Sequence, residues 1–387
     1  MPKTVYYASI GPELCLYDVD PDGAQLSKRG SVTLPANIQY AWPHPSRRYL
    51  YVVSSNGGPG LTGDKHYANA LLMDPATGAL RHHGTAAELP SRPIHVSVDA
   101  SGSYLLTAYN DPSSITVHRL DGDGTIGAAV AQPDNIDTGI YAHQILETPS
   151  RGQVTLVTRG NDAKPGKAED PGAIKTFAFS KGVLGNLASI APNNGLGFGP
   201  RHLDFHPTKP WAFVSIERQN KLYVYGLGSA TGLGREPTFV KDTLSDRKPM
   251  MRQAAGAIHV HPSGRFVYVT NRASDRSSFE GKAAVIGGKN NVAVFTIDQS
   301  TGEPTLIQNA DGNSVELRTF GIDPSGRLLV AASVATAPVL EENRVVSVPA
   351  GLSVFRIADN GELSFIRKYD VDTGDQRQFW SGMVTLP

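Results

Sequence analysis

A turn-rich pentad recurs along the chain, and it constrains the fold more than any other feature. Its second residue falls at positions 45, 100, 149, 207, 262 and 324, so successive copies are 49 to 62 residues apart. Self-similarity at such a period indicates stacked supersecondary units, each the size of a four-stranded propeller blade. The copies are HPSRR (44–48), DASGS (99–103), TPSRG (148–152), HPTKP (206–210), HPSGR (261–265) and DPSGR (323–327).

Two runs of β-forming residues separated by a polar turn follow the pentads, and YLLTAYNDPSSITVHRL (104–120) is a clear example. A seventh copy of this pattern, at 4–20, has no pentad before it, and we expect residues 379–387 to supply its inner strand. We therefore predict an all-β fold, a seven-bladed β-propeller with four-stranded antiparallel blades. The N- and C-terminal strands close the ring, and residues 1–387 form a single domain.

The longest connections are rich in Gly, Lys, Asp or Ser, and long loops of this kind are typical of functional rims or mobile segments. We expect them to surround one mouth of the central channel: 56–66, 160–172, 228–256 and 273–290.

Charge and cysteine content narrow the classes of partner. Lys+Arg and Asp+Glu number 36 each, and no basic block stands out, so neither nucleic acid nor a membrane is an expected partner. The chain has one cysteine, Cys15, and no apolar run of signal-peptide or membrane-span length. We expect a cytoplasmic monomer or weak homo-oligomer.

The repeat register also places residues in space, because equivalent positions of successive blades form a ring about the propeller axis. We expect two such rings, one opening the inner strands and one closing the next strands, at the same end of the channel. Six residues before each pentad proline, or its equivalent, stand Gln39, Ile94, His143, Arg201, Gly256 and Arg318. Ten residues after it stand Ser55, Asn110, Arg159, Glu217, Arg272 and Val334.

Arginines, a histidine and a glutamate thus converge, and ionised side chains are seldom buried without partners, so an anion-binding site is the economical explanation. Three alternatives stay open. Glu217 forms only a structural salt bridge with Arg201 or Arg272, His143 is a hydrogen-bonded channel residue, or Arg159 and Arg318 are solvated rim charges.

The other histidines do not favour a metal site. His44, His206 and His261 each begin a pentad, where a residue that satisfies the backbone of a turn is expected. The inner-strand histidines have no common register and no accompanying carboxylates, so we predict neither a metal nor a cofactor: His95, His202 and His259. Motifs for a serine nucleophile elbow and a nucleotide-binding loop are absent.

Several segments resemble the lactonase family of seven-bladed propellers, which contains propeller-type 6-phosphogluconolactonases and fungal carboxy-cis,cis-muconate cyclases. GPRHLDFHPTKPWAFVSIER (199–218) and IHVHPSGRFVYVTNR (258–272) carry the resemblance most clearly, with further segments at 318–333 and 97–120. In the cyclase branch of the family, the resemblance implies an active site of one His, two Arg and one Glu. The matching positions are those that the ring argument also selects: His143, Arg201, Arg272 and Glu217.

We accordingly expect a lactonase of carbohydrate metabolism that converts 6-phosphogluconolactone to 6-phosphogluconate. His143, Glu217, Arg201 and Arg272 are the expected catalytic residues, and either Glu217 or His143 is the base. The expected substrate-binding residues are Arg159, Arg318, Asn110 and Gln39. Another sugar lactonase or a muconate-type lactonising cyclase is the alternative of the same class, and a non-catalytic interaction propeller is the alternative of a different class.

Overall fold

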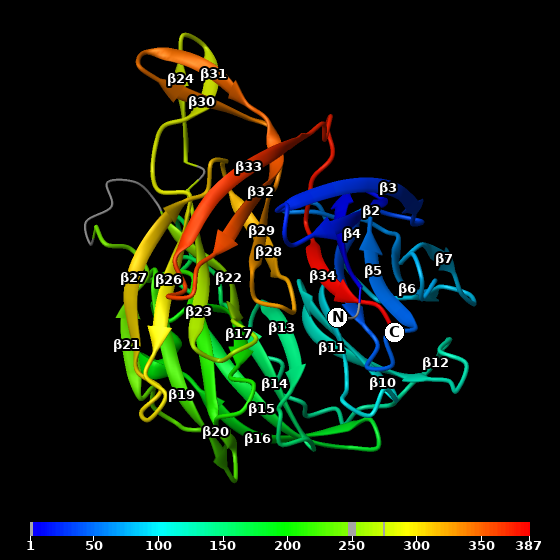
Figure 1. The fold of residues 1–387 in the computed structure, drawn as a ribbon. Coiled ribbons are helices and arrows are strands. Elements are labelled where there is room, and N and C mark those ends of the chain that lie inside the picture. Colours follow the sequence, from blue (N-terminus) through cyan, green and yellow to red (C-terminus); the bar gives the residue numbers. More distant parts are fainter. Residues whose placement is uncertain (1–2, 247–252, 274) are drawn as a thin grey trace.

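Four-stranded antiparallel sheets are the repeating unit of the structure, a computed structural model that describes residues 3–246, 253–273 and 275–387. Within those ranges seven sheets stand as blades around a central channel (Figure 1), which confirms the predicted propeller. The first blade, from the channel outward, is β34 (Ser381–Thr385), β1 (Thr4–Ile10), β2 (Glu13–Asp20) and β3 (Gln25–Thr33).

The other blades are numbered along the chain, each beginning with its inner strand. The second blade is β4 (Ile38–Pro43), β5 (Tyr49–Ser55), β6 (His66–Met73) with β7 (Leu80–His82) and β8 (Ala87–Glu88). The third is β9 (Pro93–Val98), β10 (Tyr104–Asn110), β11 (Ser113–Leu120) and β12 (Ile126–Ala129). The fourth is β13 (Ala142–Glu147), β14 (Gln153–Thr158), β15 (Ala173–Ser180) and β16 (Val183–Ile190). The fifth blade is β17 (Pro200–Phe205), β18 (Trp211–Ile216), β19 (Lys221–Ser229) with β20 (Gly232–Leu233) and β21 (Phe239–Asp242). The sixth is β22 (Ala254–Val260), β23 (Phe266–Arg272), β26 (Asn291–Ile297) and β27 (Pro304–Asp311). The seventh is β28 (Leu317–Ile322), β29 (Leu328–Ser333), β32 (Ala350–Ile357) and β33 (Leu363–Val371). A single 3-10 turn, η1 (Pro192–Gly195), is the helical element of the described residues, and none of them forms a helix long and apolar enough to span a membrane.

Both ends of the chain close the ring. β34 pairs antiparallel with β1, with Val384 opposite Val5, so the two ends lie side by side in Figure 1. This pairing confirms that the C-terminal segment supplies the inner strand of the first blade, and it removes the free edge that an open ring would leave.

The pentads are the turns between inner strands and second strands, and their histidines link neighbouring blades. His44 Nε2 lies 3.0 Å from the carbonyl oxygen of Gly102, which belongs to the pentad of the next blade. His206 and His261 make the same contact with Gly264 and Gly326, at 2.9 Å each. The structural role predicted for these three histidines is confirmed.

The core lies between the blades. Residues of β5 alternate: Leu50 and Val52 pack against the blade of β1, while Tyr51 and Val53 pack against the blade of β9. Every side chain of β5 is therefore buried, which is why second strands read as continuous apolar runs rather than as alternating ones. Apolar clusters of this kind fill each of the seven gaps between blades.

One further sheet was not anticipated from the sequence. Two hairpins from the sixth and seventh blades meet through a parallel pairing of Val285 with Val339 and project from the propeller (Figure 1). The first hairpin falls in the predicted long connection 273–290, but the second occupies a segment that reads as a simple link between two strands. Its strands are β24 (Arg276–Phe279), β25 (Lys282–Val285), β30 (Ala337–Glu341) and β31 (Arg344–Val348).

The predicted crowding of long connections at one mouth is right for three of the four. Connections 56–66, 160–172 and 273–290 follow the ends of second strands and so leave from the same end of the propeller. Connection 228–256 is an exception, because it follows the third strand β19 and starts at the opposite end. β21 then returns the chain, and residues 247–252 of this connection lie outside the described residues.

Ring closure makes a testable prediction at Leu386, which is 1% exposed and packs with Val5 and Leu14 of the first blade. Leu386→Ala should lower the free energy of unfolding by about 2–5 kcal/mol, because it leaves a cavity in the blade that joins the chain ends. Urea denaturation measures the loss. The matched control is Leu61→Ala, at a side chain 62% exposed, which should stay within about 0.5 kcal/mol of the parent. Equal effects of the two variants would contradict the role of the closing segment.

Candidate functional site

A β-bulge recurs near the start of the inner strands, at the first ring position predicted from the sequence. The pairing of β13 with β14 passes from Ala142 opposite Thr158 to Gln144 opposite Val157, which leaves His143 without a partner in the ladder. A bulged residue points away from the regular alternation of its strand, so the bulge can aim a side chain at the channel. The same shift in register leaves out the equivalent residues Gln39, Ile94, Arg201 and Arg318.

The second ring lies at the same end of the propeller. Ser55, Asn110 and Arg272 are the last residues of their second strands. The remaining three follow such a strand directly: Arg159, Glu217 and Val334. In an antiparallel pair, the start of one strand lies beside the end of the other. The two predicted rings therefore meet at one mouth of the channel.

Glu217 lies at the centre of the charged residues at this mouth. Its Oε1 lies 3.0 Å from Arg159 Nε, and its Oε2 lies 3.1 Å from both Arg201 Nε and Arg272 Nη2. Burial alone would raise the pKa of Glu217, but the guanidinium groups of Arg272, Arg159 and Arg201 lower it to about 2. Glu217 is therefore a carboxylate at neutral pH, and the three arginines share its single negative charge.

Arg159 extends the network toward the rim. Its Nη2 lies 3.0 Å from Asp162, whose other oxygen lies 2.9 Å from Nε of Arg218. Arg218 also pairs with Glu169, so both ends of the connection 160–172 are tied to the cluster. Asp162, Glu169 and Arg218 were missed by the ring argument because they lie outside its two positions, although the length of this connection marked it as a functional rim.

Tyr141 supports Arg159 with an unusual backbone conformation. It has a φ of 60°, a region that bulky side chains rarely occupy, and its carbonyl oxygen accepts a hydrogen bond of 2.9 Å from the backbone N–H of Arg159. The Arg159 guanidinium stands 5.7 Å from the centre of the Tyr141 ring. Strain of this kind clusters at functional sites, and here it lies two residues before His143.

His143 lies beside the arginines with little access to water, at 6% exposed. Burial first, and then the positive charges of Arg201 and Arg318, hold the pKa of His143 well below 6.5, so its imidazole is neutral at pH 7. Its ring centre is 4.9 Å from that of His202, which in turn lies 3.3 Å from Arg201 Nη1. Within the described ranges Nδ1 of His143 is buried and has no hydrogen-bond partner.

The other predicted substrate-binding residues divide into two groups. Gln39 Oε1 accepts a hydrogen bond of 2.9 Å from Nε of Arg92, and Arg92 and Arg318 both lie near the ring of Phe379. Asn110 ends β10 at the same mouth and is buried, but no hydrogen bond or ion pair joins it to the cluster in the described part of the chain. Arg92 and Phe379 were missed because neither stands at a ring position. The signal for Arg92 was its place two residues before Ile94.

Deeper in the channel, one expectation about the histidines proves wrong. His95, His202 and His259 have no common register, as expected, although His95 and His202 each stand one residue after the first ring. These two contact Tyr40, with ring centres 4.2 and 6.3 Å away. His259 does have an accompanying carboxylate, because its Nδ1 lies 3.5 Å from Asp204. Across residues 3–246, 253–273 and 275–387, no three His, Cys, Asp or Glu side chains are grouped closely enough to hold a metal ion.

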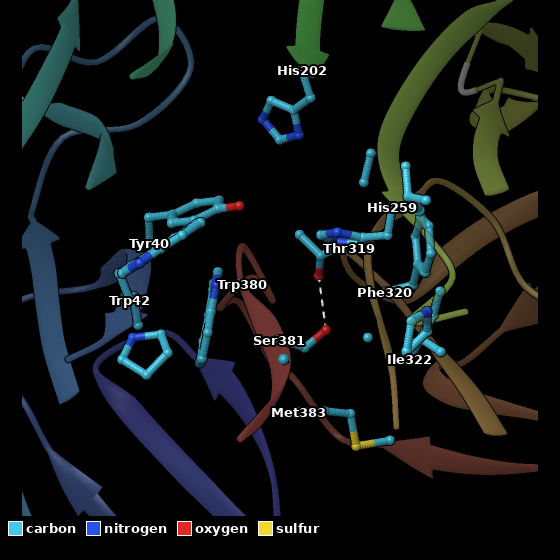
Figure 2. Close-up of a pocket in the computed structure, with 17 residues that line it drawn as sticks. Tyr40, Trp42, His202, His259, Thr319, Phe320, Ile322, Trp380, Ser381 and Met383 are labelled. Carbon is cyan, nitrogen blue, oxygen red and sulfur yellow. Dashed lines mark hydrogen bonds between the residues drawn. The ribbon is translucent and has the colours of Figure 1, made fainter. Parts of the chain in front are cut away.

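A cavity of about 310 Å³ occupies the other half of the channel (Figure 2). His202 stands at one end of it, with Tyr40 and Trp380 on one wall and His259 and Phe320 on the other. The lining is mostly aromatic and aliphatic, and it includes neither Glu217 nor the arginines paired with it. The charged cluster and the apolar cavity are therefore two ends of one channel.

Comparison with known proteins places these observations in context. The family model described as "Lactonase, 7-bladed beta-propeller" matches residues 4–339. The 6-phosphogluconolactonase of Bacillus subtilis is 26% identical over 356 residues, which cover 87% of this chain and 90% of that protein. The 6-phosphogluconolactonase of Yersinia pestis is 26% identical over 379 residues, covering 97% and 96%.

Solved structures confirm the fold. The periplasmic gluconolactonase of Pseudomonas aeruginosa superposes with a TM-score of 0.70 at 20% identity, over 99% of this chain and 100% of that one. A protein from Lactobacillus plantarum superposes with a TM-score of 0.71 at 19% identity, over the whole of both chains.

The ion-pair cluster predicts how stability depends on pH. The pKa of Glu217 is depressed from 4.5 to about 2, so its contribution is complete above pH 4.5 and disappears as the pH falls toward 2. That contribution is on the order of 3 kcal/mol. Glu217→Gln removes the carboxylate that pairs with Arg201 and Arg272 and leaves Arg159 with Asp162 alone, so it should lower the free energy of unfolding at pH 7 by about 3–5 kcal/mol.

Urea denaturation at pH 7, 5, 4 and 3 tests this prediction. The variant should lose less stability than the parent over the acidic range, so the two curves converge at low pH. Glu13→Gln, at an exposed position of β2, is the control and should follow the parent throughout. Parallel curves of stability against pH for Glu217→Gln and the parent would show that the arginines do not lower the pKa of Glu217.

Proposed function

The chain belongs to the lactonase family of seven-bladed β-propellers, and from this premise we propose that it hydrolyses the sugar-acid lactone 6-phosphogluconolactone to 6-phosphogluconate. The observation that carries the proposal is a buried Glu217 that shares its charge among three arginines beside the neutral His143. Such a site offers a base, oxyanion stabilisation and excess positive charge, which together suit an anionic lactone.

His143 is the general base of this mechanism. A neutral imidazole whose Nδ1 has no hydrogen-bond partner among the described residues can accept a proton from water as the water attacks the lactone carbonyl. The imidazolium then returns the proton to the ring oxygen when the C–O bond breaks. The product acid ionises at neutral pH, so each turnover releases one proton to solution.

Arg201 and Arg272 stabilise the tetrahedral oxyanion. Each contributes one nitrogen to Glu217 and keeps further N–H groups of its fork for another acceptor. Their positions are fixed before substrate arrives, because both contact the same carboxylate oxygen, and preorganised donors stabilise charge that develops in the transition state.

Glu217 then serves to position the arginines rather than to move a proton. A carboxylate with a pKa of about 2 and contacts to three guanidinium groups is a weak base at neutral pH. The same reasoning favours hydrolysis over the cyclase direction, which needs a proton donor. Neither Glu217 nor His143 carries an acidic proton at pH 7 in the free protein.

A direct assay tests the substrate. Proton release should follow addition of 6-phosphogluconolactone in a pH-indicator assay, with no loss of rate in EDTA. δ-Gluconolactone and a muconolactone serve as comparison substrates, and the uncatalysed hydrolysis of each is subtracted. Faster turnover of an unphosphorylated lactone would move the assignment to another lactonase. Proton release from none of the three would overturn the hydrolase proposal and leave the cyclase or the interaction propeller.

The base is tested by His143→Gln, which should lower kcat by about 10²- to 10⁴-fold while the melting temperature stays near that of the parent. The lowered pKa of His143 also predicts that kcat/KM of the parent stays flat from pH 8 to 6.5 and falls only at lower pH, where the imidazole gains a proton. His118→Gln is the matched control, because this buried histidine of β11 pairs with Leu105 at the pentad end of its blade. Unchanged turnover in His143→Gln would remove His143 from the mechanism.

The cytoplasmic location expected from the sequence is part of the same proposal, since 6-phosphogluconolactone is a phosphorylated intermediate that cells keep inside. Cell fractionation with an antibody to the chain checks it. Recovery in a periplasmic fraction would instead favour an unphosphorylated sugar lactone, in line with the periplasmic gluconolactonase that shares the fold.

A further inference from the structure

Two arginines at the catalytic mouth are not part of the Glu217 cluster. Arg92 is 6% exposed, and its Nε donates to Gln39 Oε1 at 2.9 Å. Arg318 lies at the bulge of β28. In the described part of the chain neither guanidinium has a carboxylate within 4.0 Å, whereas Arg159, Arg201 and Arg272 all reach Glu217.

One aromatic ring brings these two arginines together. The guanidinium carbon of Arg318 is 4.7 Å from the centre of the Phe379 ring, and that of Arg92 is 5.8 Å from it. Burial, and then the charge of nearby Arg272, lower the pKa of Arg318 to about 10. The charge of Arg92 acts in the same direction, while Glu316 and Glu217 oppose the shift only in part. The two cations thus repel each other and the catalytic arginines, yet they are held at the same wall of the mouth.

The aromatic ring cannot replace a counter-ion here. A cation–π contact is weaker than the cost of taking a guanidinium group out of water, so two buried arginines over one ring remain short of negative charge. A phosphate monoester carries close to two negative charges and accepts hydrogen bonds from arginine forks in bidentate fashion. A phosphate group therefore supplies the negative charge that Arg92 and Arg318 lack.

We infer that Arg92 and Arg318, whose guanidinium groups both lie against the ring of Phe379, form with Gln39 the subsite that binds the phosphate group of the substrate. The inference rests on the proposed function and assigns different roles to the two pairs of arginines at the mouth. Arg201 and Arg272 face the reacting carbonyl, while Arg92 and Arg318 hold the far end of the lactone and determine the preference for a phosphorylated substrate.

The test is the ratio of kcat/KM for 6-phosphogluconolactone to kcat/KM for δ-gluconolactone. Arg92→Met should lower kcat/KM for the phosphorylated lactone by about 10- to 150-fold, the range for a lost hydrogen bond to a charged group. The value for δ-gluconolactone should change less than about threefold. Arg92→Lys should recover only part of the loss, because lysine keeps the charge but not the fork.

Arg265→Met is the matched control. Arg265 also stands over an aromatic ring, 5.0 Å from the centre of Phe266, but it belongs to a pentad turn at the other end of the propeller. Its removal should leave the ratio unchanged. An equal fall for both lactones in Arg92→Met, or no change for either, would overturn the subsite even though the lactonase proposal stands.

A binding measurement separates the two proposals if the parent protein hydrolyses neither lactone. Isothermal titration of the parent with 6-phosphogluconate should then show binding that weakens at least tenfold in Arg92→Met but not in Arg265→Met. That result upholds the anion subsite and rejects the lactonase. Absence of binding to the parent rejects both.

Discussion

The pairing of β34 with β1 is the constraint on which the rest of the structure depends. A propeller blade buries both faces of its second strand only if it has a neighbour on each side, so seven blades must form a closed circle. The chain achieves closure by placing its last strand innermost in its first blade. Closure also fixes the direction of all inner strands about the axis. Residues that open these strands must then meet at one mouth, whatever their separation in sequence.

The recurring bulge converts this general property of propellers into a specific site. A regular strand would send alternate residues to the channel and into the gaps between blades, where apolar packing is required. An extra residue at the second position of the inner strand has no partner and can be polar without disturbing the ladder. His143, Arg201 and Arg318 all occupy it. The three therefore reach the mouth while their neighbours in the strand still pack in the core.

Sequence reasoning predicted much of this, because the information is carried by a repeat. The pentads marked the turns, and counting from them found Arg159, Arg201, Arg272 and Glu217, which the structure joins through direct contacts. Residues outside the repeat could not be found by counting. Arg92 reaches the mouth from just before β9.

The small sheet of β24, β25, β30 and β31 was missed for a related reason. Its two hairpins lie far apart in sequence and meet through one parallel pair, Val285 and Val339, which no local pattern encodes. Apolar periodicity predicts that a strand forms, but it does not predict its partner when the partner belongs to another insertion. The register of His95 and His202 could have been found by counting, since both stand one residue after the first ring.

The balance of charge at the mouth links binding to catalysis. Burial, and then the positive charges of four arginines, hold the pKa of His143 low, and three of those arginines also pair with the central Glu217. An anion that binds Arg92 and Arg318 offsets part of that positive potential, and so raises the pKa of His143 toward the range in which a general base is effective. An uncharged lactone brings no such change. In the proposed mechanism the arrangement therefore couples the strength of the base to the charge of the substrate, and a preference for an anion would arise in the chemical step as well as in binding.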